Sequence, residues 1–436
     1  MSDQKRRVAI TGFGVISPLG NTPEDLWQAL QDRRSGVAPI QQFPTETLPF
    51  SFGGECQAFS GDIGDFGELG PSVKKQIRKG LKVMCREIQT GVAATQRSIV
   101  HAGFGEGSLD PLRTGIVFGS DYITTLPDEF TEGVRACADS GVFELDRWPE
   151  DGLPKVTPLW LLKYLPNMPA CHVAIYNDLR GPNNSITVRE ASANLAIAEA
   201  YSTIVRNHAD VILCGATGSR IHPLRTIHTL LQEQLATGDI APEAASRPFD
   251  KDRQGMVVGE GAATLVLEDL DSAVKRGATI YGEVVGYGSS SVMSRTGLAD
   301  RATSLANSIQ MALRTADKKP TDIGHYHAHG IGTIQCDQAE ADAVQRVFGP
   351  IDQQPPVVAA KSYTGNMGAG SGMVEIICSV LACGNSQLFD TLNFDTPDPA
   401  CPVRIAAASD APGRCFVSAS VTPQGQSSAV LIEMAS

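Results

Sequence analysis

The segment RPFDKDRQGMVVGEG occupies residues 247–261, and an apolar, strand-like run follows it at 263–267. Two other segments, one on each side, resemble each other. Residues 8–14 read VAITGFG and residues 278–288 read ATIYGEVVGYG, so each is an apolar run that ends in glycine. Such runs are typical of strands that lead into tight turns. The repetition indicates an internal duplication with a seam near 268–276.

Strand-like and helix-like patterns alternate along the chain. Thr22 followed by Pro23 predicts the start of the first helix, because threonine caps a helix N-terminus and proline suits its first position. Alternation of strands with helices is typical of an α/β architecture. The other strand-like runs lie at 115–119 and 210–214, and the helical patterns include 191–207 and 304–316.

The composition excludes several classes of protein. Of the 436 residues, 42% are hydrophobic and 19% are charged, which is too apolar for a disordered chain. The formal net charge of -12 argues against a broad nucleic-acid-binding surface. We see no apolar run of about 18 residues and no signal-peptide pattern at the N-terminus. We therefore expect a cytoplasmic protein without membrane insertion.

The ten cysteines form no C-x-x-C pair. This spacing disfavours a zinc ribbon or a redox dithiol, and it favours buried free thiols in a reducing compartment. His325, His327 and His329 alternate, but without a neighbouring cysteine or aspartate partner they do not favour a metal site. We therefore predict neither a bound metal nor a cofactor.

Motifs in a fixed order run along the chain on both sides of segment 247–261. His329 lies in an Ala-His-Gly triplet, and a Lys-Ser pair begins at Lys361. Together the motifs resemble the β-ketoacyl-acyl-carrier-protein synthases of fatty acid and polyketide synthesis, and the elongating type in particular. The segments that carry the resemblance are 6–12, 17–20, 180–183, 247–261, 328–333, 361–365 and 393–399.

The resemblance implies the thiolase fold, an α/β fold in which two similar layered αβαβα halves are related by a pseudo-twofold axis. We expect these halves at residues 1–267 and 268–436. The resemblance also implies an acyl carrier protein as a partner. It further implies a dimer, which is either a homodimer or a heterodimer with a Cys-containing ketosynthase.

The position of the family's nucleophile is altered. The family has Thr-Ala-Cys-Ala-Ser there, whereas residues 187–192 read TVREAS, so Glu190 takes the cysteine position. A carboxylate cannot carry an acyl chain as a thioester. Two interpretations stay open. Glu190 is either a structural acid at a helix N-terminus, paired with Arg189, or a stand-in for a charged or acylated cysteine, as glutamine is in chain-length factors and loading synthases.

The resemblance implies roles for four further positions. His329 corresponds to the first histidine of the catalytic set and Lys361 to the lysine beside it. Asn366 stands where the elongating enzymes have a second histidine. It can donate a hydrogen bond to a thioester carbonyl but cannot transfer a proton. Asp337 and Glu340 match acids that support Lys361.

The family's glycine-rich loop near the C-terminus is also altered. In the family this loop completes an oxyanion hole and carries a gating phenylalanine, next to a tunnel for the acyl chain. Residues 423–428 read PQGQSS here. Gln424 takes the gating position, and among the family's glycines only Gly425 is kept.

One basic cluster contrasts with the acidic chain. Positions 74, 78, 82 and 86 repeat every four residues, which places them on one face of a predicted helix. On composition alone this is a solvated helix face. The resemblance makes it a docking surface for the acidic acyl carrier protein. The docking residues would be Lys74, Lys75, Arg78, Lys79 and Lys82.

Three functions are compatible with these residues. The first, which we favour, is a partner subunit without condensing activity, like a chain-length factor. The second is decarboxylation of a malonyl-carrier protein by His329, Asn366 and Lys361 without acyl transfer. The third is a thioester hydrolase or proton-abstracting enzyme with Glu190 as general base. An intact condensing synthase fits the residues least.

Overall fold

The computed structural model describes residues 6–407 and 409–435, and ten strands in these ranges form one mixed sheet. A separate two-stranded sheet consists of β2 (Ala38–Pro39) and β3 (Phe52–Gly53). The ten strands are β1 (Val8–Ile16), β4 (Thr114–Ser120), β5 (Asn183–Thr187), β6 (Val211–Ser219), β7 (Glu260–Asp269), β8 (Gly282–Ser291), β9 (His325–His327), β10 (Val357–Val358), β11 (Cys415–Val421) and β12 (Gln426–Met434).

The strand order repeats in the two halves of the sheet. Along the sheet it runs β10-β9-β11-β12-β8-β1-β7-β6-β4-β5. Read outward from the centre, the order is β1-β7-β6-β4-β5 in the N-terminal half and β8-β12-β11-β9-β10 in the C-terminal half, so each half begins with its first strand followed by its last. In each half the first strand is antiparallel to the last, and the outer strands are parallel. At the centre β1 and β8 pair antiparallel, with Val8 opposite Val284. The prediction of two similar α/β halves is confirmed.

The position of the seam between the halves stays a prediction. The expected boundary between residues 267 and 268 falls inside β7, two residues before this strand ends at Asp269. The helix α8 (Leu270–Lys275) then leads to β8. We propose that α8 is the connection between the halves.

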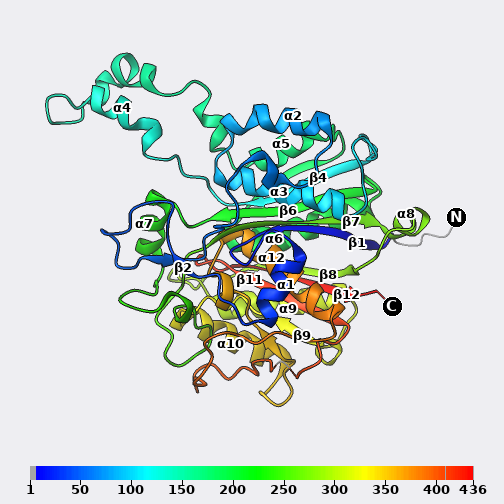
Figure 1. Cartoon of the computed structure of the whole chain (residues 1–436). Coiled ribbons are helices and arrows are strands. Elements are labelled where there is room, and N and C mark those ends of the chain that lie inside the picture. The colour runs from blue at the N-terminus through cyan, green and yellow to red at the C-terminus, as the bar shows by residue number, and fades with distance from the viewer. Residues whose placement is uncertain (1–5, 408, 436) are drawn as a thin grey trace.

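Helices lie on both outer faces and between the two half-sheets (Figure 1). α3 packs on β1, β6 and β7, α9 packs on β8, β11 and β12, and α6 and α12 lie between the half-sheets and touch each other. This gives five layers. The helices besides α8 are α1 (Pro23–Gln31), α2 (Pro71–Gly80), α3 (Arg86–His101), α4 (Asp128–Ala136), α5 (Met168–Tyr176), α6 (Ser192–Val205), α7 (Pro223–Gln232), α9 (Arg301–Thr315), α10 (Ile334–Phe348), α11 (Lys361–Thr364) and α12 (Ser371–Gly384).

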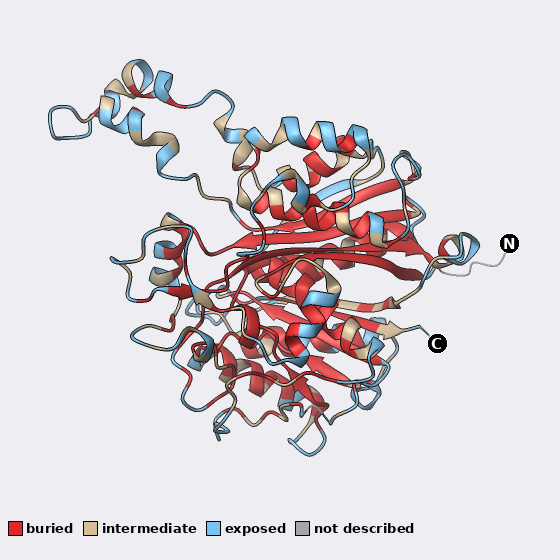
Figure 2. Cartoon of the chain, in the orientation of Figure 1, coloured by how far each residue is buried: buried red, intermediate tan, exposed pale blue. Residues whose placement is uncertain are grey.

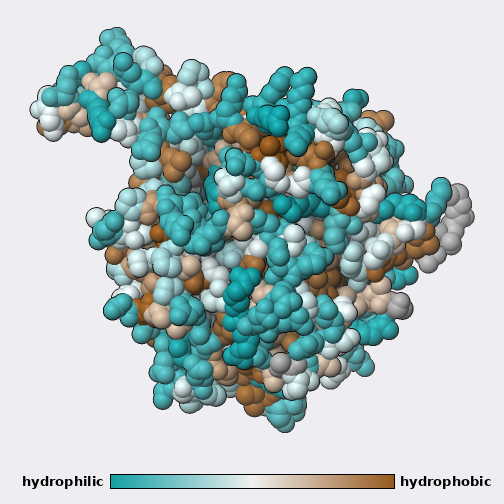
Figure 3. Space-filling view, viewed as in Figure 1, coloured by the Kyte–Doolittle hydropathy of each residue, from teal (hydrophilic) through white to brown (hydrophobic). Residues whose placement is uncertain are grey.

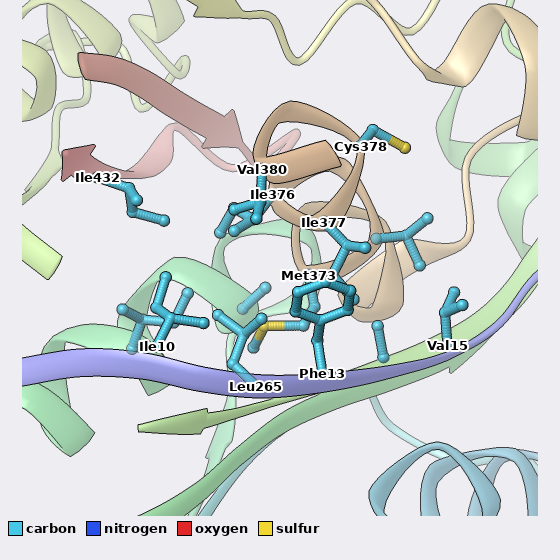
Figure 4. Close-up of a cluster of buried hydrophobic side chains, with 14 of the residues drawn as sticks. Ile10, Phe13, Val15, Leu265, Met373, Ile376, Ile377, Cys378, Val380 and Ile432 are labelled. Atoms are coloured by element: carbon cyan, nitrogen blue, oxygen red, sulfur yellow. The ribbon is translucent and has the colours of Figure 1, made fainter. Parts of the chain in front are cut away.

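The core is centred on the layer between the half-sheets. Every residue of β1 is buried, because protein covers both of its faces. Figure 4 shows Phe13 of β1 and Leu265 of β7 beneath Met373 and Ile377 of α12. Figure 2 shows the same pattern over the whole chain, with buried residues in the central helices and strands. A helix that protein surrounds is apolar on most of its faces, and α12 is apolar apart from Glu375 and two serines.

One segment projects away from these layers. It carries α4 and several short helical turns, and Figure 1 shows it at the upper left, joined to the body by two extended connections. Phe130 packs against Trp148 and Trp160 within it, with ring centroids 6.0 and 4.9 Å away. In the part of the chain that the structure describes, no helix has the length and apolar character to span a bilayer.

Candidate functional site

Glu190 lies in the single turn that precedes α6, and its side chain is 1% exposed. Its carboxylate forms an ion pair with the buried Arg220, accepts a hydrogen bond from Asn366 Nδ2 at 3.2 Å, and lies 3.5 Å from Arg189 Nε. Burial alone would raise the pKa of Glu190. The positive charges of Arg220 and Arg189 outweigh burial and lower that pKa below its ordinary value. Glu190 is therefore a fixed, ionised carboxylate.

His329 and Lys361 meet next to this carboxylate. Lys361 Nζ donates to the backbone carbonyl of His329 at 2.7 Å and forms an ion pair with Glu375 of α12. Burial and the charge of Lys361 lower the pKa of His329 well below its ordinary value, against the opposite effect of Glu190. His329 is therefore neutral near pH 7. Its Nδ1 is buried and has no hydrogen-bond partner among the described residues.

Glu375 was missed in the sequence. It is 1% exposed and is the buried acid that neutralises Lys361. The signal that could have found it is its setting, because it is an acid inside the otherwise apolar helix α12. An ionised side chain in such a helix needs a partner of opposite charge.

Asp337 and Glu340, in the first turns of α10, hold loop backbone. Glu340 accepts hydrogen bonds from the N–H groups of His329 and the following glycine, at 2.7 and 2.8 Å. Asp337 accepts one from the N–H of Phe249 at 2.8 Å. Lys361 has its direct partners elsewhere. The two acids thus fix the loops around His329, and Glu340 also lies near enough to Lys361 for the lysine charge to act on it directly.

Family models match most of the chain. Residues 5–273 match the description "Beta-ketoacyl synthase, N-terminal domain" and residues 281–395 match "Beta-ketoacyl synthase, C-terminal domain". The chain belongs to the β-ketoacyl synthase family. The 3-oxoacyl-(acyl-carrier-protein) synthase 2 of Synechocystis sp. is 32% identical over 399 residues, which are 91% of this chain and 90% of the relative. The protein of the same name from Coxiella burnetii is 33% identical over 91% of each chain.

Solved structures give the same result for the fold. The structure titled "The ishigamide ketosynthase/chain length factor" has a TM-score of 0.83 and 27% identity, and it covers 99% of this chain and 100% of its own. A β-ketoacyl synthase from Burkholderia phymatum has a TM-score of 0.84 at the same identity and coverage. The thiolase fold is thereby confirmed. The chain is a β-ketoacyl-synthase-like protein of fatty acid or polyketide synthesis.

Residues 423–428, where the sequence predicts the counterpart of the family's gating loop, begin in a tight hairpin turn. Thr422 and Gln426 pair across the turn between β11 and β12, and Gly425 has a φ of 82°. A Cβ at Gly425 would lie 2.8 Å from the carbonyl oxygen of Val292, so the turn needs glycine at this position. Gln424 is exposed, whereas Glu190 and its neighbours are buried. The turn therefore presents Gln424 to solvent.

The basic segment is not one continuous helix, and this part of the prediction is wrong. α2 ends at Gly80, a short turn follows, and α3 begins at Arg86. The guanidinium of Arg86 points inward, where it pairs with Glu260 at 2.8 Å and donates to the carbonyl of Phe59 at 2.7 Å. The five predicted docking residues Lys74, Lys75, Arg78, Lys79 and Lys82 are all exposed.

The surface of α2 combines charge with an apolar border. Val73 and Ile77 face the core, which turns the basic side chains outward. Figure 3 shows hydrophilic residues over α2 with hydrophobic residues beside them. Next to α2 lies a cavity of about 550 Å³, and the exposed Ile175 is among its lining residues. Such a face offers both positive charge and apolar contact to a partner.

His325 and His327 have structural partners. His325 Nδ1 lies 2.8 Å from the carbonyl of Pro412, and its Nε2 lies 2.9 Å from Ser379 Oγ. His327 Nδ1 lies 2.8 Å from the same hydroxyl. The alternation of these residues with His329 along the chain therefore reflects packing against α12.

Proposed function

We propose that this chain is a partner subunit without condensing activity, similar to a chain-length factor, that pairs with a Cys-containing ketosynthase and binds an acyl or malonyl carrier protein. The observation that carries the proposal is the Glu190–Arg220 ion pair at the position of the family's nucleophile. One of the solved relatives has a chain length factor in its title, and this supports a subunit of that kind. Cys214 lies on another element, β6, where burial raises the pKa of its thiol and opposes thiolate formation.

The arrangement around Glu190 argues against its action as a general base. A general base works best when its pKa lies near the operating pH. The pKa of Glu190 is instead lowered, and Arg220 and Asn366 occupy the carboxylate oxygen Oε1. The other oxygen, Oε2, accepts no hydrogen bond among the described residues, and Arg189 Nε lies 3.5 Å from it, so the charges of two arginines oppose a proton on this carboxylate. The lowered pKa of Glu190 therefore disfavours the hydrolase hypothesis.

A second candidate function is decarboxylation of a malonyl thioester without condensation. During decarboxylation the thioester carbonyl gains negative charge, and it then needs hydrogen-bonding groups around its oxygen. The neutral His329 and the amide of Asn366 are two such groups. The unpartnered Nδ1 of His329 favours this candidate. Lys361 would hold the histidine loop through its bond to the His329 carbonyl.

Two measurements on purified protein separate these functions. As a partner subunit, the chain should co-purify with a Cys-containing ketosynthase from the same cell, and alone it should form no β-ketoacyl product from malonyl- and acyl-carrier protein. Condensation by the isolated chain would contradict the proposal. As a decarboxylase, it should release CO2 from malonyl-carrier protein alone, and His329→Ala should abolish this release. Absence of CO2 release removes the second candidate.

A further inference from the structure

Two buried arginine–carboxylate pairs lie side by side at the position of the family's nucleophile. Arg220 follows β6 directly and pairs with Glu190. Arg225, in the first turn of α7, pairs with Asp121, which follows β4. All four side chains are at most 2% exposed. Buried ion pairs of this kind are stable only when further hydrogen bonds hold both partners.

Further contacts fix both arginines. Arg220 Nη1 donates to the hydroxyl of Thr229 at 3.4 Å, and the guanidinium of Arg225 lies over the ring of Tyr122 at 4.5 Å from its centroid. The two pairs converge on Gly368. A Cβ built there would lie 3.4 Å from Asp121 Oδ2, 3.7 Å from Arg220 Nε and 3.8 Å from Arg225 Nη2. The space beyond the tip of Glu190 is therefore filled with charged side chains.

We infer that Arg220 closes this site to acyl groups. The inference rests on the proposed function and explains how the pocket of a non-condensing subunit is kept shut. An acyl group on residue 190 starts where the carboxylate now ends, and its first carbons need the volume that the guanidinium occupies. An alkyl chain in that place would also leave buried charges without partners, which proteins avoid. Arg220 thus excludes the acyl chain by volume and by charge.

The test places a thiol at position 190 and measures access to it. Three variants are compared: Glu190→Cys, Glu190→Cys/Arg220→Met and Glu190→Cys/Arg220→Ala. Methionine keeps most of the arginine volume without its charge, so it is the matched control for volume. Alkylation of Cys at position 190 by iodoacetamide is followed by peptide mass spectrometry. We expect the alanine variant to react at least about tenfold faster than the other two, because reactivity follows exposure of the thiol.

The order of the labelling rates distinguishes closure of the site by Arg220 from an electrostatic effect of Arg220 on the thiol. An arginine beside a thiol lowers its pKa and increases the thiolate fraction, so with equal access Glu190→Cys would react fastest. Labelling of Glu190→Cys at a rate equal to or above that of Glu190→Cys/Arg220→Ala would overturn the inference. No partner subunit takes part in the assay, so its outcome is independent of whether the chain pairs with a ketosynthase.

A second measurement covers the case in which the cysteine variants do not fold. Glu190→Ala/Arg220→Ala removes both charges and opens the space, whereas Glu190→Gln/Arg220→Met removes the charges and keeps the space filled. Titration calorimetry with decanoate should detect binding to the first variant and none to the second or to the unchanged chain. Equal behaviour of the two variants would contradict closure by Arg220.

Discussion

At the scale of single residues, the Glu190–Arg220 pair governs what the site can do. Both side chains are 1% exposed, so water cannot replace either partner. The pair holds Glu190 ionised and in place, and Asn366 completes its surroundings. Removal of one member of this buried pair leaves the other charge without its partner, and the effect on stability can be measured.

Arg220→Ala should destabilise the protein strongly. It leaves Glu190 buried with only the more distant Arg189 as a charged partner, and loss of one member of a buried ion pair costs about 3–5 kcal/mol. Glu190→Gln/Arg220→Met should cost clearly less, because it leaves no charge without a partner. Urea unfolding of the three proteins measures the difference. If Arg220→Ala lowers the free energy of unfolding by less than about 1 kcal/mol, the pair behaves like a solvent-exposed salt bridge, and the prediction is wrong.

At the scale of elements, the turn between β11 and β12 depends on Gly425. Gly425→Ala should cost about 1–3 kcal/mol, since a residue with a Cβ is strained at a φ of 82°. The side chain would also meet the carbonyl of Val292. Gln424→Ala is the matched control, because Gln424 is exposed one residue earlier in the same turn. If the two variants have equal thermal stability, the turn relaxes to accept the added Cβ, and the predicted strain at Gly425 is wrong.

The exposed face of α2 makes a second prediction at this scale. Lys75→Glu/Arg78→Glu should weaken binding of the acyl carrier protein, and the loss should be larger at low salt, because charge complementarity acts over a distance that salt shortens. Surface plasmon resonance at two ionic strengths measures both effects. Lys251→Glu/Lys275→Glu is the control, with the same change in charge at exposed positions on other elements. If both double variants weaken carrier-protein binding equally, the effect comes from net charge alone, and the docking face on α2 is contradicted.

At the scale of the whole molecule, several buried histidines link stability to pH. Burial is the main cause that lowers the pKa of His222 and His325 to about 4, and that of His327 well below its ordinary value. In the unfolded chain histidine titrates near pH 6.5. Below that pH the unfolded state therefore binds protons that the folded state does not. This contribution to stability is complete above about pH 6.5 and is lost as the pH falls toward about 4.

The histidine contribution to the free energy of unfolding should thus fall between about pH 6.5 and 5, by up to about 1.4 kcal/mol per pH unit for each such histidine. Asp337, whose pKa burial raises to about 7, acts in the opposite direction, so the comparison between variants isolates the histidines. Urea unfolding across this range gives the slope. His325→Gln should reduce the slope by the share of one histidine, whatever its effect on stability at pH 7. His208→Gln, which removes an imidazole at an exposed position, is the matched control. An unchanged slope in His325→Gln would contradict a neutral buried His325.

Local signals in the sequence predicted the elements well and the pairings between distant residues poorly. Thr22 was correctly predicted as a cap, since its side chain accepts from the N–H of Asp25. The strand-like runs and helical patterns appear within a few residues of their predicted ends. The partnership of Arg220 with Glu190 depends on a contact between separate elements, which no local pattern encodes. Glu375 did carry a local signal, an acid within an apolar helix, but its partner Lys361 lies on another element. The break at Gly80 was missed because the four-residue spacing of basic residues continues across it.

The pairing of β1 with β7 has a consequence for synthesis of the chain. Val8 pairs with Asp269 and with Val284, so β1 leaves the ribosome well before either of its partner strands and has none of them to join until the end of the N-terminal half has been made. At about 5–20 residues per second this delay is on the order of ten to fifty seconds. During that time a largely apolar strand, which is fully buried in the folded protein, is unpaired and open to aggregation. This is the interval in which a chaperone would have the most to protect.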